Sequence, residues 1–227
     1  MNGSDLKTAR TTSNWTQAEA ASRLGVTQAY LSMLERGSRP VSDDLVPTVL
    51  RVFALPPTAR PLQAVKGVAP GDEFFKSSLG ELGYPGFAYL KSRRLLNPAE
   101  LLLLALDSEE LDARVTEALP WLPFHFPNLD WAWLVSESKL KDRQNRLAYV
   151  TLLASDVAQS RGEVKLAEAL RSHVAGLERS RLANEDTLAK RSLSQAERKW
   201  LRSRRSPDAA HWNLLTDLKA EDLQHVF

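Results

Sequence analysis

Residues 16–37 read TQAEAASRLGVTQAYLSMLERG, and this stretch decides the fold of the N-terminal region. Thr16 and Glu19 have the spacing of a capping box, in which a hydroxyl and a carboxylate each satisfy a backbone N–H at a helix start. The helix predicted from this signal runs from about Gln17 to Leu24. It ends at Gly25, because glycine tolerates the left-handed backbone that terminates helices.

A second short helix is predicted after this turn. Thr27 is its expected N-cap, and the helix runs to about Arg36 and stops at Gly37. The side chains spaced to pack inward are Leu6, Trp15, Leu24, Val26, Leu31 and Leu34. The outward face is short, polar and mostly uncharged, and consists of Gln28, Ala29, Ser32, Met33 and Arg36. Such a face suits the reading of base edges in the major groove of DNA.

The stretch resembles the phage-repressor and Cro (XRE) class of helix-turn-helix regulators. The resemblance rests on the Thr-Gln start, the Ala-x-x-Leu-Gly-Val-Thr turn and the Leu-Glu-Arg-Gly end, and it covers roughly Leu6 to Pro56. It implies a lambda-repressor-like domain of five helices that binds double-stranded operator DNA as a homodimer, on half-sites about one helical turn apart. Ala20 departs from the family, which usually has a larger aliphatic side chain there, so Trp15 or Phe53 is expected to fill that space.

The resemblance also assigns individual roles. Base contacts fall on Gln28, Ala29 and Met33, with Tyr30 and Ser32 nearby; glutamine can bond adenine, and alanine or methionine can touch a thymine methyl. Gln17 is expected to contact a phosphate and to brace Gln28. The other expected contacts to the DNA backbone are Thr27, Arg36, Ser38 and Arg39. Arg10 and Glu35 are expected to form a structural ion pair. The alternative is a scaffold that makes protein contacts only.

The composition is that of an ordinary folded chain, with 227 residues of which 43% are hydrophobic and 26% charged. The absence of cysteine excludes disulfides and cysteine zinc sites, and it favours a cytoplasmic location. Residues 1–10 lack the apolar core of a signal peptide, and the apolar run Leu101–Leu106 is too short to cross a bilayer. We therefore expect no membrane association. The net charge of +2 merely permits nucleic-acid binding.

Proline and glycine interrupt the chain between Pro56 and Asp72, which predicts a domain boundary there. We expect a DNA-binding domain at residues 1–67 and a larger all-helical domain, for dimerisation or partner binding, at residues 68–227. Strand signals are poor throughout, so the predicted fold class is all-α. Pro47 predicts a helix that starts later than Ser42. The acidic residues at 108–110 predict the start of another helix. The wide apolar band in residues 140–159 predicts a helix at the centre of the second domain.

Three segments of the second domain are candidates for partner binding. The aromatic segment 121–133 is either core or a binding surface, with Trp121, Phe124, Trp131 and Trp133 as candidate contacts. Residues 142–146 form either a solvated or salt-bridged face, or a polar patch that presents Arg143 and Arg146 to a partner. The basic segment 198–205 holds five basic residues and Trp200. It suits DNA or RNA phosphates, an exposed helix end, or an acidic partner protein.

Catalytic motifs are missing from the sequence: it has no Gly-x-Ser-x-Gly elbow, no His-Glu-x-x-His and no Walker-type loop. The four histidines, which are His125, His173, His211 and His225, lack neighbours at metal-ligand spacing. We therefore expect no enzyme, no metal and no cofactor. An enzyme with a DNA-binding domain remains one alternative, recognisable by clustered titratable residues with perturbed pKa values.

The order of an XRE-type domain followed by a helical domain is similar to antitoxins of bacterial toxin–antitoxin pairs. Such proteins repress their own operon and neutralise a toxin through the second domain. The Asp-x-Gln-Asn-Arg-Leu pattern at residues 142–147 and His-Trp-Asn-Leu-Leu at residues 211–215 resemble regulators associated with nucleotidyltransferase-type toxins. The sequence thus predicts an autorepressing antitoxin with a toxin protein as partner. The alternative is a ligand-responsive repressor without a toxin.

Overall fold

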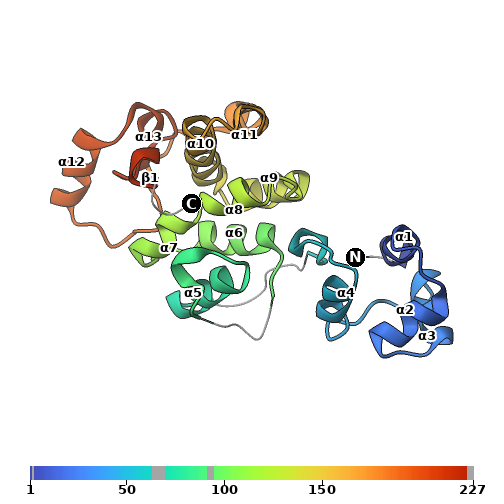
Figure 1. Cartoon of the computed structure of the whole chain (residues 1–227). Helices are drawn as coiled ribbons and strands as arrows, with labels where there is room; N and C mark the ends of the chain where they lie inside the picture. The colour runs from blue at the N-terminus through green and yellow to red at the C-terminus, as the bar shows by residue number, and fades with distance from the viewer. Residues whose placement is uncertain (2, 63–69, 91–94, 224–227) are drawn as a thin grey trace. The chain divides into compact units, whose positions relative to one another are not determined.

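The computed structural model describes residues 1, 3–62, 70–90 and 95–223, and these are mostly helical (Figure 1). The chain divides into two compact units. Unit 1 comprises Met1–Gln63 and Leu95–Asn97, and unit 2 comprises Ala64–Arg94 and Pro98–Phe227. The predicted first domain, residues 1–67, lacks Leu95–Asn97, which the structure assigns to unit 1. Asn97 lies there because its side-chain amide donates hydrogen bonds to the carbonyls of Thr58, at 3.1 Å, and Arg60, at 2.7 Å.

Unit 1 is built from short helices around one apolar core. Its described residues form α1 (Gly3–Thr12), α2 (Gln17–Leu24), α3 (Gln28–Glu35), α4 (Val46–Val52) and the 3-10 helix η1 (Pro57–Ala59). Leucines from the first three helices are buried in this core, and Trp15 and Val26 pack against it. Phe53 is buried beside them, with its ring centroid 5.2 Å from that of Trp15. Small, fully buried Ala20 belongs to the same core as these two rings.

Local signals in the sequence account for the ends of α2 and α3. The Thr16 hydroxyl accepts from the backbone N–H of Glu19, at 3.2 Å, and the Glu19 carboxylate accepts from the Thr16 N–H, at 2.7 Å. Gly25 follows α2 with a φ of 69°, in the left-handed region. Thr27 caps α3 by accepting from the Tyr30 N–H. The predicted capping box and the predicted turn between the two helices are therefore confirmed.

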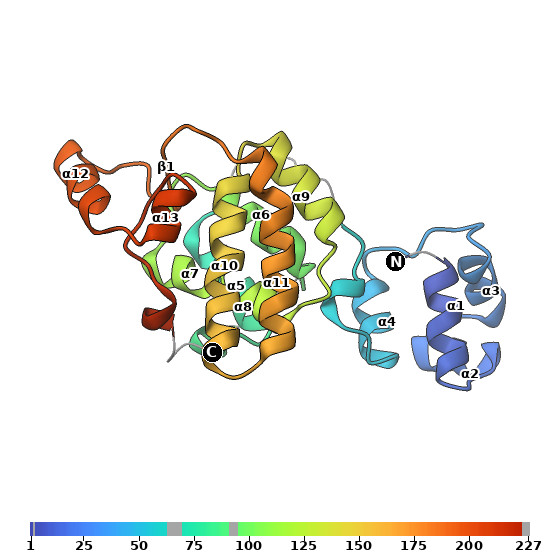
Figure 2. The ribbon, with the colours of Figure 1, turned by 90° about the horizontal axis from the view of Figure 1, so that it is seen from above.

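Unit 2 is organised about α10. Its described elements are α5 (Asp72–Glu81), η2 (Pro85–Phe87), α6 (Pro98–Asp107), α7 (Ala113–Ala118), α8 (Trp121–His125), α9 (Trp131–Leu140), α10 (Gln144–Ser160), α11 (Val164–Leu177), η3 (Glu178–Ser180), β1 (Asp186–Thr187), α12 (Gln195–Arg204), α13 (Pro207–His211), β2 (Leu214–Leu215) and η4 (Ala220–Leu223). Helix α10 is buried along most of its length and lies side by side with α11 (Figure 2). The predicted apolar central helix is thus present.

Two details of the predicted secondary structure need comment. Helix α4 begins at Val46 with Pro47 in its first turn, which confirms a start later than Ser42. The helix start expected at residues 108–110 is wrong, because this segment pairs instead with residues 189–191: Leu111 donates its N–H to the Ala189 carbonyl, and Arg191 donates its own to Glu109, both at 2.9 Å. The next helix, α7, begins only at Ala113.

The described part of unit 2 contains two short β-strands, which pair in parallel. β1 and β2 pair over two residues, with Asp186 opposite Leu214. The pairing holds the segment before α12 against the segment after α13, and it places Asp186 next to α10, whose Arg146 it contacts. Among the described residues, every helix falls short of the length and apolar character needed to cross a membrane.

Candidate nucleic-acid interface

The outer face of α3 is the surface on which the predicted base contacts lie. Gln28 and Ala29 are exposed, and Ser32 and Met33 are half-buried. Tyr30 is also half-buried and packs in part against the core of unit 1, so less of its ring faces outward than the sequence suggested. Within Gln28–Glu35, which is described throughout, the one acidic residue is Glu35, and its side chain is buried. The exposed face is therefore free of the negative charge that would repel phosphate.

A partly buried polar cluster joins α1, α2 and α3. Arg10 contacts both carboxylate oxygens of Glu35, with Nε 2.6 Å from Oε1 and a second guanidinium nitrogen 3.1 Å from Oε2. A third Arg10 nitrogen donates to the Trp15 carbonyl at 2.8 Å. The two charged side chains are 12% and 2% exposed. The ion pair expected between Arg10 and Glu35 is present, and its two parallel hydrogen bonds restrict the orientation of α3.

Gln17 completes this cluster in a way that differs from the expectation. Its side-chain amide donates to Oε2 of Glu35 at 2.8 Å, rather than to Gln28. Burial raises the pKa of Glu35, but the hydrogen bonds from Arg10 and Gln17 outweigh burial and hold it below its ordinary value. Glu35 is therefore ionised at neutral pH, and Gln17 braces α3 through that carboxylate.

Apart from Gln17, the residues expected to contact the DNA backbone lie at the two ends of α3 and are exposed: Thr27 at its start, and Arg36, Ser38 and Arg39 beyond its end. Some of their polar groups already have partners within unit 1. The Thr27 hydroxyl caps α3, Arg36 donates through Nε to the Ser32 carbonyl at 3.2 Å, and the Ser38 hydroxyl donates to the Met33 carbonyl at 3.0 Å. These contacts hold the chain close to the end of α3, where Arg36 and Arg39 are exposed.

The aromatic segment 121–133 of unit 2 is partly core and partly exposed. Trp121 is buried, and its ring stacks on His125 with centroids 4.5 Å apart, so the expectation of a partner contact through Trp121 is wrong. Trp131 is half-buried and stacks on His173, with centroids 4.0 Å apart. Phe124 and Trp133 are half-buried as well. Trp200, on α12, is 48% exposed and is the most accessible of these aromatic candidates.

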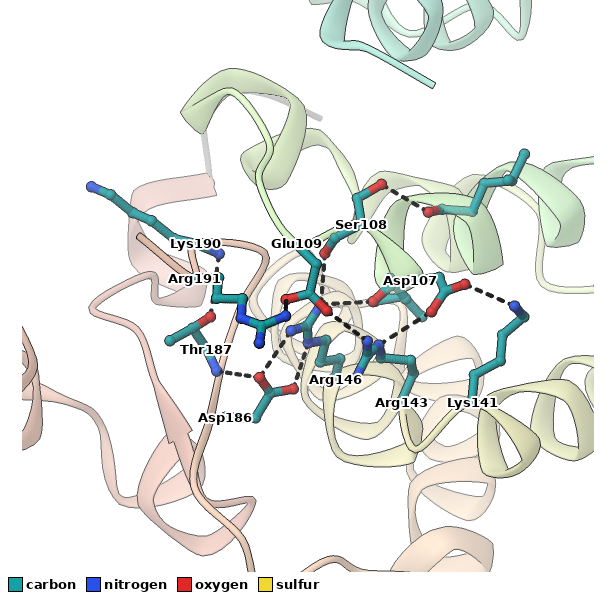
Figure 3. Close-up of polar contacts among 12 residues, drawn as sticks. Asp107, Ser108, Glu109, Lys141, Arg143, Arg146, Asp186, Thr187, Lys190 and Arg191 are labelled. Atoms are coloured by element: carbon teal, nitrogen blue, oxygen red, sulfur yellow. Dashed lines mark hydrogen bonds and ion pairs between the residues drawn. The ribbon is translucent and has the colours of Figure 1, made fainter. Parts of the chain in front are cut away.

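Arg146 is an internal residue rather than part of a surface patch (Figure 3). Its side chain is 1% exposed and pairs with both oxygens of Asp186, at 2.7 and 2.9 Å. A remaining nitrogen donates to the carbonyls of Leu106 and Ser108, both at 2.8 Å. Burial raises the pKa of Asp186, but its bonds to Arg146 bring it below its ordinary value. The expectation that Arg146 binds a partner protein is wrong, because each nitrogen of its guanidinium donates to an acceptor inside unit 2.

Arg143 lies beside this cluster and is better accessible. It is 3.4 Å from an oxygen of Asp107 and donates to Glu109 at 3.0 Å, while Lys141 pairs with Asp107 at 2.7 Å (Figure 3). Of the two interpretations of residues 142–146, the salt-bridged one describes Arg143. Residues 144–146 are buried, so this stretch is not a solvated face.

The basic segment 198–205 is partly neutralised by its own surroundings. Arg202 donates to Glu185 at 2.9 Å, and Arg205 lies 3.6 Å from the same carboxylate. The guanidinium of Arg204 lies over the Trp200 ring, 5.3 Å from its centroid. These pairings reduce the positive charge available for nucleic-acid phosphates and favour the interpretation as a structured helix end.

The histidines that the sequence left without neighbours have partners where the structure describes them: His125 and His173 stack on tryptophans. His211 lies 2.7 Å from Glu178, a neighbour distant in sequence that spacing could not reveal. His225 lies outside the described residues. Across the described ranges, histidine, aspartate and glutamate side chains do not come together in a group of three that could hold a metal ion.

Comparison with known proteins identifies unit 1 only. Residues 6–59 match the helix-turn-helix family model, which is of the XRE type, and the matched range runs from α1 to η1. This match supports a DNA-binding transcription regulator. No curated protein and no solved structure matches the chain.

Proposed function

We propose that the protein is a sequence-specific transcription regulator that binds operator DNA as a homodimer, with α3 in the major groove. The observation that carries this proposal is the acid-free outer face of α3, braced by the cluster of Arg10, Gln17 and the buried Glu35. A recognition helix needs such support, because base readout depends on side chains that are held in a fixed position. The match of residues 6–59 to a helix-turn-helix family supports the same function.

We further propose that the protein is an autorepressing antitoxin, which binds a toxin protein through unit 2. Unit 2 is larger than DNA binding requires, has its own core, and presents Trp200 at its surface. Co-expression with the product of the adjacent gene should yield a stoichiometric complex of the two proteins. It should also relieve the growth arrest that the adjacent gene product causes when expressed alone. Growth arrest that this protein does not relieve would contradict the antitoxin role. Release of DNA by a small molecule, without a protein partner, would favour a ligand-responsive repressor.

Replacing Gln28 with alanine should relax specificity at one base step. The exposed Gln28 is at the start of α3, where a glutamine amide can pair with adenine, so its loss should cost about 1–3 kcal/mol on the preferred operator. The measurement is fluorescence anisotropy on that operator and on single-base variants of it. Gln159→Ala, which changes an exposed glutamine of unit 2, is the matched control. An unchanged ranking of the operators by Gln28→Ala would remove Gln28 from the base contacts.

Replacing Arg39 with glutamine should weaken binding to all DNA sequences alike. Arg39 is exposed just beyond α3, and a lost phosphate contact should reduce the slope of log affinity against log salt by about 1. Titrations at several salt concentrations measure this slope. Arg179→Gln, at an exposed position of unit 2, controls for the change in net charge. Equal slopes for Arg39→Gln and the unmodified protein would show that Arg39 does not contact phosphate.

A further inference from the structure

A groove of about 470 Å³ lies in unit 2, lined by α7, by the segment leading into α12, by α12 itself and by residues that follow β2. Its floor is apolar and includes Leu188, Leu193, Leu201 and Leu215, all buried. The last three form a hydrophobic cluster of their own. Trp200 lines the same groove with 48% of its surface exposed. Exposed aromatic side chains at the edge of an apolar depression are typical of binding hot spots.

The rim of this groove is negatively charged. Glu117, Glu197, Asp217 and Asp222 line it, against a single base, Lys190. Ion pairs in the described part of unit 2 use other carboxylates. Glu197 and Asp222 do accept hydrogen bonds from backbone N–H groups, of Ser194 and Lys219 respectively, but neither bond brings a positive side chain to the rim. The groove therefore combines an apolar floor with an edge on which four carboxylates outnumber one lysine.

We propose that this groove binds a basic amphipathic segment of a partner protein. Apolar side chains of that segment would contact Trp200 and the leucine floor, and its lysines and arginines would lie against the four carboxylates. Charge complementarity favours this occupant, because opposite charges across an interface steer association and disfavour other partners. It also disfavours nucleic acid, whose phosphates the same carboxylates repel. The inference rests on the partner-binding part of the proposed function and names the chemistry of that partner.

The test uses two synthetic amphipathic peptides of about 18 residues, long enough for five helical turns. One peptide has leucine and lysine at helical spacing, and the other has glutamate in place of every lysine. Labelled peptides are titrated with the full-length protein, and binding is followed by fluorescence anisotropy. We expect the leucine–lysine peptide to bind and the leucine–glutamate peptide not to bind. Neither titration contains DNA, so failure of operator binding would leave the result intact.

Groove variants locate the binding. Trp200→Ala removes the exposed aromatic ring, Asp217→Lys reverses one rim charge, and each should weaken binding of the leucine–lysine peptide by about tenfold. The matched controls are Leu140→Ala, at an apolar side chain that is 76% exposed elsewhere, and Glu168→Lys, at an exposed carboxylate of α11. These controls should bind the peptide as the unmodified protein does.

Three outcomes would overturn the proposal. Equal binding of both peptides would show that charge does not select the occupant, and equal weakening by groove variants and controls would place the binding elsewhere. The third outcome is a dimer, seen by sedimentation, that Trp200→Ala dissociates. It would show that a second copy of this chain, rather than a separate partner, covers the groove.

Discussion

Replacing Arg146 with methionine should lower the free energy of unfolding of unit 2 by about 3–4 kcal/mol, as expected when one partner of a buried ion pair is removed. Arg146 is 1% exposed and contacts Asp186 and the carbonyls of Leu106 and Ser108. Methionine fills a similar volume but donates no hydrogen bond. Both carbonyls therefore lose the arginine donor, and the Asp186 carboxylate keeps the N–H of Thr187 but loses both bonds to the guanidinium. Denaturant unfolding followed by tryptophan fluorescence measures the effect, since all tryptophans except Trp15 belong to unit 2.

Two further variants show whether the burial of Arg146 causes the large destabilisation by Arg146→Met. Arg171→Met removes an arginine that is 51% exposed and paired with Asp156, and it should change the free energy of unfolding by less than about 1 kcal/mol. Arg146→Lys keeps the charge but cannot form the same paired hydrogen bonds, so it should remain clearly destabilised. Equal effects of Arg146→Met and Arg171→Met would contradict the internal role of Arg146.

Replacing Glu35 with alanine should destabilise unit 1 by about 2–3 kcal/mol, because it leaves the mostly buried Arg10 guanidinium without its carboxylate. Gln17 loses its partner in the same step, so α3 loses its polar links to α1 and α2 and keeps only the apolar core. Hydrogen exchange with mass spectrometry should show faster exchange in peptides that cover residues 16–36, while unit 2 exchanges as before. Asp44→Ala, at an exposed carboxylate of unit 1, is the matched control. Unchanged protection of α3 in Glu35→Ala would contradict the bracing role.

The lowered pKa of Glu35 also predicts a pH dependence. The folded state favours the ionised carboxylate more than the unfolded state does, so its contribution to stability is complete above the ordinary glutamate pKa. The contribution is lost as the pH falls through the lowered pKa of the folded protein. Thermal unfolding followed between about pH 6 and pH 3 should therefore show a smaller acid destabilisation of unit 1 in Glu35→Ala than in the unmodified protein.

The helix-turn-helix could be predicted from sequence because its signals are local. The capping box of Thr16 and Glu19, the left-handed Gly25 and the cap at Thr27 each act within a few residues of the helix end that they define. The periodicity of the apolar residues then places the core on one side and the exposed face of α3 on the other. The Arg10–Glu35 pair spans a longer distance, and it was accessible only through the family resemblance.

The errors arose where distant segments decide the structure. Arg146 looked like part of a polar surface, because its partner Asp186 lies forty residues away in sequence. Residues 108–110 looked like a helix start, but their backbone pairs with residues 189–191. The groove beside Trp200 is likewise assembled from segments that are far apart in the chain. Composition and spacing carry no information on such pairings, so neither the internal arginine nor the groove could be predicted.

The most direct test of the central claim is fluorescence anisotropy of the full-length protein with labelled DNA from its own upstream region, against a shuffled sequence of equal length. If α3 reads an operator there, binding should be tighter than to the shuffled DNA by about a thousandfold or more, and it should weaken as salt rises. Gln28→Ala should reduce that preference. Equal affinity for both DNAs at every salt concentration would contradict the proposal that this protein is a regulator of its own operon.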